Sequence, residues 1–114
     1  MIECKRGDVV LVEVVLSDGS GVKHRPAVVG SSDEYNQARQ QAVVAAITGR
    51  TDRMLPGDHL ISDWHSAGLL FPSAVTGALI TVRQEMISRK LGAMPSMDMR
   101  LISSKIRRNM GLGE

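Results

Sequence analysis

The segment DVVLVEVVL, residues 8–16, constrains the fold more than any other part of this sequence. It is rich in β-branched residues and too short for a typical helix, so it predicts a β-strand. Side chains alternate between the two faces of a strand, and here both faces are mostly apolar. Such a strand needs cover on both sides, from the interior of a barrel on one and from a helix or a second subunit on the other.

Further short strands follow in the first half of the chain. Turn residues at 17–21 indicate a hairpin loop, after which RPAVVG, residues 25–30, predicts a second strand. Ser32 or Asp33 can cap one short helical turn. AVVAAIT, residues 42–48, then predicts a third strand.

The second half continues with strands and then changes period. PGDHLI, residues 56–61, predicts a turn and a short strand, and PSAVTGALITV, residues 72–82, predicts one long strand or two strands broken at Gly77. QEMISRKLG, residues 84–92, predicts a short helix, and residues 96–111 predict a longer one.

The longer helix has recognisable ends and one apolar face. Ser96 is its expected N-cap, and Gly111 follows its last turn. Met99, Ile102 and Ile106 share one face at spacings of three and four residues. Strands thus come first and helices last, without the alternation of a doubly wound sheet. We expect a mainly β, α+β fold: a small antiparallel barrel or sheet carrying peripheral helices.

Composition indicates one ordinary folded domain. The 114 residues are about one domain long, so we expect a single domain over residues 1–114. Hydrophobic residues make up 43% and charged residues 23%, which is typical of a soluble globular protein and argues against disorder. The net charge of +2 permits an anionic partner such as nucleic acid without requiring one.

Cysteine usage and the N-terminus indicate the cytoplasm. The single cysteine, Cys4, has no partner for an internal disulfide and cannot supply a zinc cluster. The start MIECKRGDVV is charged before it is apolar, unlike a secretion signal. No apolar run approaches the length of about 20 residues that spans a bilayer. We therefore expect a cytoplasmic protein without membrane contact.

Arg25 is held directly before a proline. The ring of Pro26 pushes the preceding residue out of the helical region, so Arg25 is a cation with a restricted, extended backbone. The simplest interpretation is a solvated arginine at the start of a strand. The next observation favours a second interpretation.

Strand pairing brings Arg25 close to a hydroxyl group. If the second and third strands are antiparallel neighbours with Gly30 opposite Val43, Arg25 lies opposite Thr48 and projects from the same face. A guanidinium and a hydroxyl so placed at the open end of a sheet can bind and polarise a phosphate. The register predicts a phosphate site at this pair.

Four blocks now carry a resemblance. KRGDVVLVEVVLSDGSGVKHRPAVV, VAAITG, GLLFPSAVTGALITV and ISRKLG, in this order, resemble the PemK/MazF family of type II toxin–antitoxin endoribonuclease toxins over nearly the whole chain. The resemblance implies an SH3-like barrel that forms a homodimer and cuts single-stranded mRNA without metal or other cofactor. The ribose 2′-OH is the implied nucleophile, and a cognate antitoxin protein is an implied partner.

The resemblance also implies site residues. The family's arginine before proline corresponds to Arg25, and its threonine at the end of the third strand corresponds to Thr48, which makes these two the expected catalytic residues. Lys23 and Arg50 flank the pair and are expected to hold neighbouring phosphates. Asn36, Ser73, His24 and Phe71 complete the expected RNA-binding set. The last two depart from the family pattern: the position of His24 is acidic in some members, and the position of Phe71 is often basic.

Other polar residues are weaker candidates. His59 and His65, with Asp58 and Asp63, match no known metal-site spacing, so we interpret them as surface residues and expect no metal. Asp63, His65 and Ser66 are too close in sequence for a nucleophilic triad without special geometry.

Two alternative functions remain open at this point. One is a non-catalytic toxin on the same barrel that inhibits a protein such as gyrase. The other is an SH3-like peptide-binding module, which would need an aromatic groove. Only Tyr35, Trp64 and Phe71 are aromatic, so the module is the weaker of the two.

Overall fold

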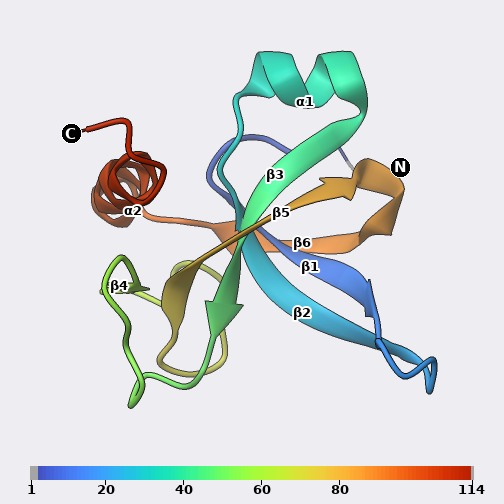
Figure 1. The fold of residues 1–114 in the computed structure, drawn as a ribbon, viewed down its shortest axis with the longest axis horizontal. Helices are drawn as coiled ribbons and strands as arrows, with labels where there is room; N and C mark the ends of the chain where they lie inside the picture. Colours follow the sequence, from blue (N-terminus) through green and yellow to red (C-terminus); the bar gives the residue numbers. More distant parts are fainter. Residues whose placement is uncertain (1–2, 114) are drawn as a thin grey trace.

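Six β-strands form one antiparallel sheet, with a short helix after the second strand and a longer helix near the C-terminus (Figure 1). The computed structural model describes residues 3–113, to which all structural statements below refer. The elements are β1 (Asp8–Val15), β2 (Val22–Val29), α1 (Asp33–Arg39), β3 (Gln41–Thr48), β4 (His59–Leu60), β5 (Ala74–Arg83), a 3₁₀ turn η1 (Gln84–Met86), β6 (Ile87–Ala93) and α2 (Ser96–Asn109).

The strand order in the sheet is β4-β5-β3-β2-β1-β6. The sheet is strongly twisted, so that its strands cross in Figure 1, with the β1–β2 hairpin extending to one side and α2 lying on the other. No ladder joins β4 to β6 among the described residues, so hydrogen bonds do not close the sheet into a barrel. The predicted mainly β class with a C-terminal helix is confirmed.

Strand β1 is covered on both faces, as its sequence predicts. Val9 belongs to a core that includes Val28, Ile47 and Ile102 of α2. Val10 and Val12 project to the opposite face and belong to a second core. All three valines are at most 4% exposed. The helix covers one face, and the curled sheet encloses the other.

Both helices begin near the expected positions. Ser32 caps α1, where its hydroxyl accepts a hydrogen bond from the Tyr35 backbone N–H at 3.1 Å. Helix α2 starts at Ser96, but Pro95 occupies the N-cap position and no side chain caps the helix, so the expected Ser96 cap is wrong by one residue. Ile102 is buried in the first core, and Met99 and Ile106 pack against it, which confirms the predicted apolar face.

The helix expected at residues 84–92 is wrong. Only the 3₁₀ turn η1 is helical, and strand β6 follows it and pairs with β1. The reason is tertiary: β1 has a second edge whose backbone groups need partners, and pairing with β6 satisfies them. Two irregularities interrupt this pairing, where Val9 and Val10 face Gly92 and Lys90, and where Leu11 and Val12 face Arg89 and Ile87.

Strand β5 is one continuous strand with a bulge near Gly77. Ala45 pairs with Leu79 and Ile47 with Val75, so three β5 residues lie opposite Ala46 alone. The Thr76 hydroxyl donates a hydrogen bond to the Ala46 carbonyl at 2.9 Å. The strand is therefore bent at Gly77 but not broken there.

Two glycines bring the segment between β4 and β5 directly against β6. Gly68 has φ +85°, and a Cβ atom there would overlap the Leu91 carbonyl. On the other side of the contact, a Cβ atom on Gly92 would lie 2.6 Å from the Ala67 carbonyl oxygen. The two backbones therefore touch with no side chain between them, a spacing that only glycine permits.

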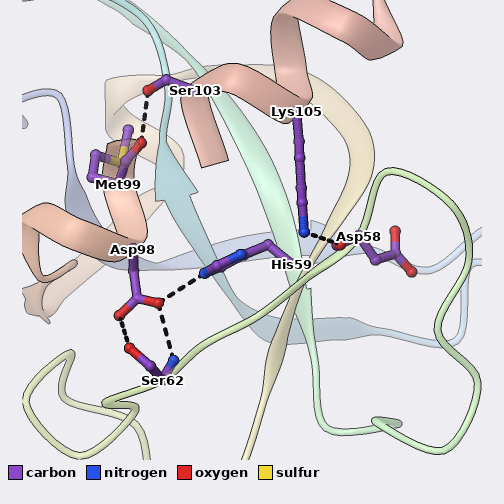
Figure 2. Close-up of polar contacts among 7 residues, drawn as sticks. All are labelled: Asp58, His59, Ser62, Asp98, Met99, Ser103 and Lys105. Atoms are coloured by element: carbon purple, nitrogen blue, oxygen red, sulfur yellow. Dashed lines mark hydrogen bonds and ion pairs between the residues drawn. The ribbon is translucent and has the colours of Figure 1, made fainter. Parts of the chain in front are cut away.

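A buried carboxylate joins α2 to the segment around β4 (Figure 2). Asp98, 1% exposed, accepts hydrogen bonds from His59 Nε2 at 2.8 Å and from the backbone N–H and hydroxyl of Ser62 at 3.0 and 2.9 Å. Burial alone would raise the pKa of Asp98, but these hydrogen bonds outweigh it and lower the pKa below its usual value. His59 is 7% exposed, so its interpretation as a surface residue is wrong.

A second contact holds the far end of the same helix. Lys105 donates a hydrogen bond to the Asp58 backbone carbonyl at 2.9 Å, as Figure 2 shows. The Asp58 carboxylate in turn accepts hydrogen bonds from the backbone N–H groups of Leu55 and Gly77.

None of the described helices is long and apolar enough to cross a bilayer.

Candidate functional site

The β2–β3 register agrees with the prediction, but the two strands separate before reaching the predicted pair. Ala27 lies opposite Ala46 and Val29 opposite Val44, the register that places Gly30 opposite Val43. The ladder ends at Ala27, next to Pro26, which has no N–H to donate. Arg25 instead pairs with Val12 of β1 and Thr48 with Ala74 of β5, so the two residues are not direct ladder partners.

A cavity of about 570 Å³ occupies the place where the strands separate. Arg25 and Pro26 line it from β2, and Thr48, Gly49 and Arg50 line it from the end of β3 and the residues after it. The apolar part of its lining comes from Leu11, Ile47, Leu69, Leu70, Phe71 and Leu91. Arg25 and Thr48 thus line one cavity, although they do not pair.

The charges in this cavity have one sign. Its lining includes three arginines, Arg25, Arg50 and Arg89, and no aspartate, glutamate or histidine. Arg50 has one ion pair, a 3.6 Å contact with Asp52, and both of these side chains are more than 60% exposed, so the pair is weak. Arg25 and Arg89 make no side-chain hydrogen bond or ion pair with any residue in 3–113. The site therefore presents unpaired guanidinium groups, which suit a phosphate.

Two hydroxyl groups line the cavity and differ in what they can offer. The Thr48 Oγ1 accepts a hydrogen bond from the Arg50 backbone N–H at 3.1 Å, which fixes the oxygen and leaves its own proton free to donate. The Ser73 hydroxyl donates to the Phe71 carbonyl at 2.9 Å, and Ser73 is 2% exposed. Thr48 is therefore the available donor, whereas Ser73 holds the chain beside Phe71.

Phe71 lies at the rim of the cavity over Gly49. A Cβ atom on Gly49 would lie 2.5 Å from the Phe71 ring, so the ring packs where a side chain would otherwise stand. Leu70 and Phe71 are 88% and 55% exposed. Neighbouring exposed apolar side chains beside cations offer a surface against which a nucleic-acid base can pack.

Three expected site residues lie outside the cavity lining. Lys23 and His24 are exposed on β2 and pair with Val14 and Glu13. Because side chains alternate along a strand, His24 lies on the face opposite Arg25. Asn36 is fully buried, and its side chain bonds Ser31, so it has no exposed surface with which to contact RNA.

The candidate metal ligands do not gather. His59 is bonded to Asp98, and Asp63 accepts hydrogen bonds from the hydroxyl and the backbone N–H of Ser66, which lower the pKa of Asp63. Within the described part of the chain, no three His, Cys, Asp or Glu side chains are grouped so that they could hold a metal ion.

Sequence reasoning missed Arg89 and Leu91, because it assigned residues 84–92 to a helix. Both residues line the cavity from β6. The signal that could have placed them is the apolar character of β1 on both faces, which indicates a strand buried inside the fold. The backbone groups of a buried strand need partners, so a strand is expected on each edge of β1.

A second cavity, of about 240 Å³, shares Arg25 and Pro26 with the first. Its lining is mainly apolar and includes Val12, Val14, Ile80 and Met86 together with Arg25. Val14, Val15, Val22 and Ile80 nearby are 37 to 64% exposed. Arg25 therefore stands between a cation-lined cavity and an uncovered apolar surface.

The twisted antiparallel fold of this chain recurs in solved toxin structures. A MazE–MazF crystal structure from Deinococcus radiodurans superposes with a TM-score of 0.82, at 15% identity over 99% of this chain and 100% of that chain. An endoribonuclease in complex with its cognate antitoxin from Mycobacterial species gives 0.77, at 19% identity over 97% and 98%. The Mycobacterium tuberculosis toxin MazF-mt6 gives 0.76, at 18% identity over 94% and 99%. These likenesses establish a shared fold.

The family follows from a sequence model. Residues 5–110 match the model of the PemK-like, MazF-like toxin of type II toxin–antitoxin systems, and the chain belongs to this family. No curated protein sequence matches the chain significantly.

Proposed function

We propose that this chain is the toxin of a type II pair and cuts single-stranded RNA, with the cavity beside Arg25 as its active site. The observation that carries the proposal is the lining of that cavity: three arginines, a free hydroxyl donor on Thr48 and an apolar rim, with no acidic side chain to repel a phosphate. Cations bind the RNA backbone, and an apolar rim accepts a base. Relatives of the same fold include a Mycobacterial endoribonuclease, which agrees with this assignment.

In the proposed reaction the ribose 2′-OH attacks the adjacent phosphate. The O2′–P bond forms as the 2′-OH gives its proton to solvent water, and the bond from phosphorus to the 5′ oxygen of the next nucleotide breaks. Water returns a proton to the leaving oxygen, so the products are a 2′,3′-cyclic phosphate and a free 5′-OH. Arg25 stabilises the negative charge that develops on the phosphate oxygens, since a guanidinium is always protonated and is no general base. The Thr48 hydroxyl donates a hydrogen bond to a phosphate oxygen or orients the 2′-OH. The cavity lining offers no carboxylate or imidazole to hold a metal, which supports a route without one.

Arg25 suits this role because its backbone is fixed. Pro26 restricts the backbone of Arg25 to an extended conformation, and pairing with Val12 fixes that backbone against the neighbouring strand β1. The side chain therefore meets the phosphate with less loss of conformational freedom than an arginine on a mobile loop.

We also propose that the active form is a homodimer and that a cognate antitoxin binds it. Val14, Val15, Val22 and Ile80 form a cluster of exposed apolar side chains beside the second cavity, and a second copy covers it in this proposal. The solved relatives of this fold include an endoribonuclease in complex with its cognate antitoxin and MazE–MazF structures. Sedimentation at micromolar concentration tests the dimer, and an active monomer would contradict it.

The central experiment is cleavage of a mixed-sequence RNA in the presence of a chelator, with analysis of the product ends. We expect cyclic phosphate and 5′-OH ends, and no cleavage when the ribose at the cut site is 2′-deoxy. Arg25→Ala should lower kcat by about 10²- to 10³-fold, the usual effect of removing a preorganised donor. Arg25→Lys should remain impaired, because an ammonium cannot hold two phosphate oxygens in one plane.

Arg83→Ala is the matched control for Arg25→Ala. Arg83 is exposed, pairs with Glu85 at 3.0 Å and does not line the cavity, so its loss removes one charge without touching the site. Full activity of Arg25→Ala, or normal cleavage of the deoxy-substituted strand, would refute the proposed mechanism.

A further inference from the structure

Arg89 of β6 reaches the cavity because of the irregular pairing between β6 and β1. In a regular strand, Ile87 and Arg89 would project from the same face. Here Val12 pairs with Ile87 and its neighbour Leu11 pairs with Arg89, so one extra β6 residue lies between the two pairs. The bulge turns the two side chains to opposite faces: Ile87 belongs to the second core, and Arg89 lines the cavity with Leu11.

Lys90, the next cation, pairs in regular register beside Arg89 and so projects to the opposite face, and the second bulge lies beyond it. Val9 pairs with Gly92 and Val10 with Lys90, which leaves Leu91 as the extra residue, and Leu91 lines the cavity. Lys90 instead binds the buried carboxylate of Asp8 at 3.1 Å. Of two adjacent basic residues, one is therefore neutralised by a partner, while the other has no ion pair within residues 3–113.

Arg89 and Arg25 stand on either side of β1. Leu11 of β1 pairs with Pro26 on one edge and with Arg89 on the other, so the backbones of the two arginines are two strand spacings apart, about 10 Å. Both side chains line the same cavity. A pair of unpaired guanidinium groups at this separation fits a ligand with more than one phosphate, such as a nucleic-acid strand.

We infer that Arg89 binds a backbone phosphate beside the scissile one and so fixes the position of the RNA strand in the cavity. This inference rests on the proposed function of the site. Arg25 acts on the reacting phosphate, whereas Arg89 contacts a phosphate that does not react. Its contribution is therefore the same in the ground state and the transition state, and it appears in binding more than in chemistry.

Binding is measured with labelled single-stranded DNA of mixed sequence, which carries the same phosphates as RNA and lacks the 2′-OH nucleophile. Arg89→Ala should weaken binding about tenfold or more, the usual effect of losing a hydrogen bond to a charged group. The slope of log K against log salt should fall by about 0.7, since one phosphate contact is lost on a single strand. Arg89→Lys should keep the slope and recover part of the affinity, because the charge remains.

Arg83→Ala is again the matched control, because it removes the same charge from an exposed site outside the cavity. In RNA cleavage, Arg89→Ala should raise KM while kcat falls less than tenfold, the reverse of the pattern expected for Arg25→Ala. Binding, salt slope and KM equal to those of Arg83→Ala would overturn the inference, as would failure of the wild-type chain to bind single strands. If the wild-type chain binds DNA through Arg89 but cleaves no RNA, the phosphate site stands and the proposed function fails.

Discussion

Replacing Asp98 by alanine tests whether one buried carboxylate holds α2 on the sheet. The change removes three hydrogen bonds, one from His59 and two from Ser62. Ser62 is exposed, so water can replace the partner of both of its donors. His59 is 7% exposed, and its Nε2 group would be left without a partner, which costs about 1–3 kcal/mol. With about 1 kcal/mol for the two Ser62 bonds, we expect Asp98→Ala to lower the free energy of unfolding by roughly 2–4 kcal/mol.

The assay is urea unfolding followed by the fluorescence of Trp64, which packs against the same core as α2. Ser62→Ala is the matched control, because it removes only the hydroxyl bond at an exposed residue, and it should cost less than about 1 kcal/mol. A loss of less than about 0.5 kcal/mol for Asp98→Ala, the usual effect of a surface substitution, would refute the reasoning.

The same carboxylate gives stability a pH dependence of known sign. The folded pKa of Asp98 lies below its unfolded value, so its contribution is fully present above the unfolded pKa, about 3.9. That contribution is lost as the pH falls from there through the lower folded pKa. Wild type should therefore lose more stability than Asp98→Ala over this acidic range, and equal losses in the two proteins would contradict the assignment.

Two further substitutions test local geometry. Gly68→Ala should lower the free energy of unfolding by more than about 2 kcal/mol, because it adds backbone strain at positive φ and a clash with the Leu91 carbonyl. The control, Gly111→Ala, is also at positive φ but has open space around it, and it should cost about 1 kcal/mol or less. Equal losses for the two variants in urea unfolding would show that the clash is relieved. Ser32→Ala should cost about 1 kcal/mol through loss of the α1 cap, and an unchanged unfolding midpoint would show that the cap contributes nothing.

Structural features that depend on residues close together in the sequence were predicted correctly from the sequence. The apolar run of β1, the cap at Ser32 and the i, i+3, i+4 face of α2 are properties of neighbouring residues, and the structure has all three. The β2–β3 register was also predictable, since short antiparallel neighbours leave few alternatives. Arg25 and Thr48 were brought together by that register, and both line the cavity.

What the sequence did not predict depends on tertiary contacts. Residues 84–92 have a helix-like pattern, and only the free edge of β1 makes 87–93 a strand, so Arg89 was missed. His59 was assigned to the surface because its partner, Asp98, lies 39 residues away in sequence. Asn36 was assigned to RNA binding, while burial and Ser31 give it a structural contact instead.

Gly68 and Gly92 are in contact through backbone atoms, with no side chain between them, so this contact does not constrain which side chains stand at the cavity rim. The residues that follow Gly68 provide the exposed rim, Leu70 and Phe71, while Gly92 lies in β6, the strand that bears Arg89. Because backbone alone sets their separation, rim residues can be exchanged without loosening the support beneath them. If the proposed function holds, recognition and scaffold can vary separately, and grafting residues 70–72 from a relative should alter which RNA sequence is cut as long as both glycines are kept.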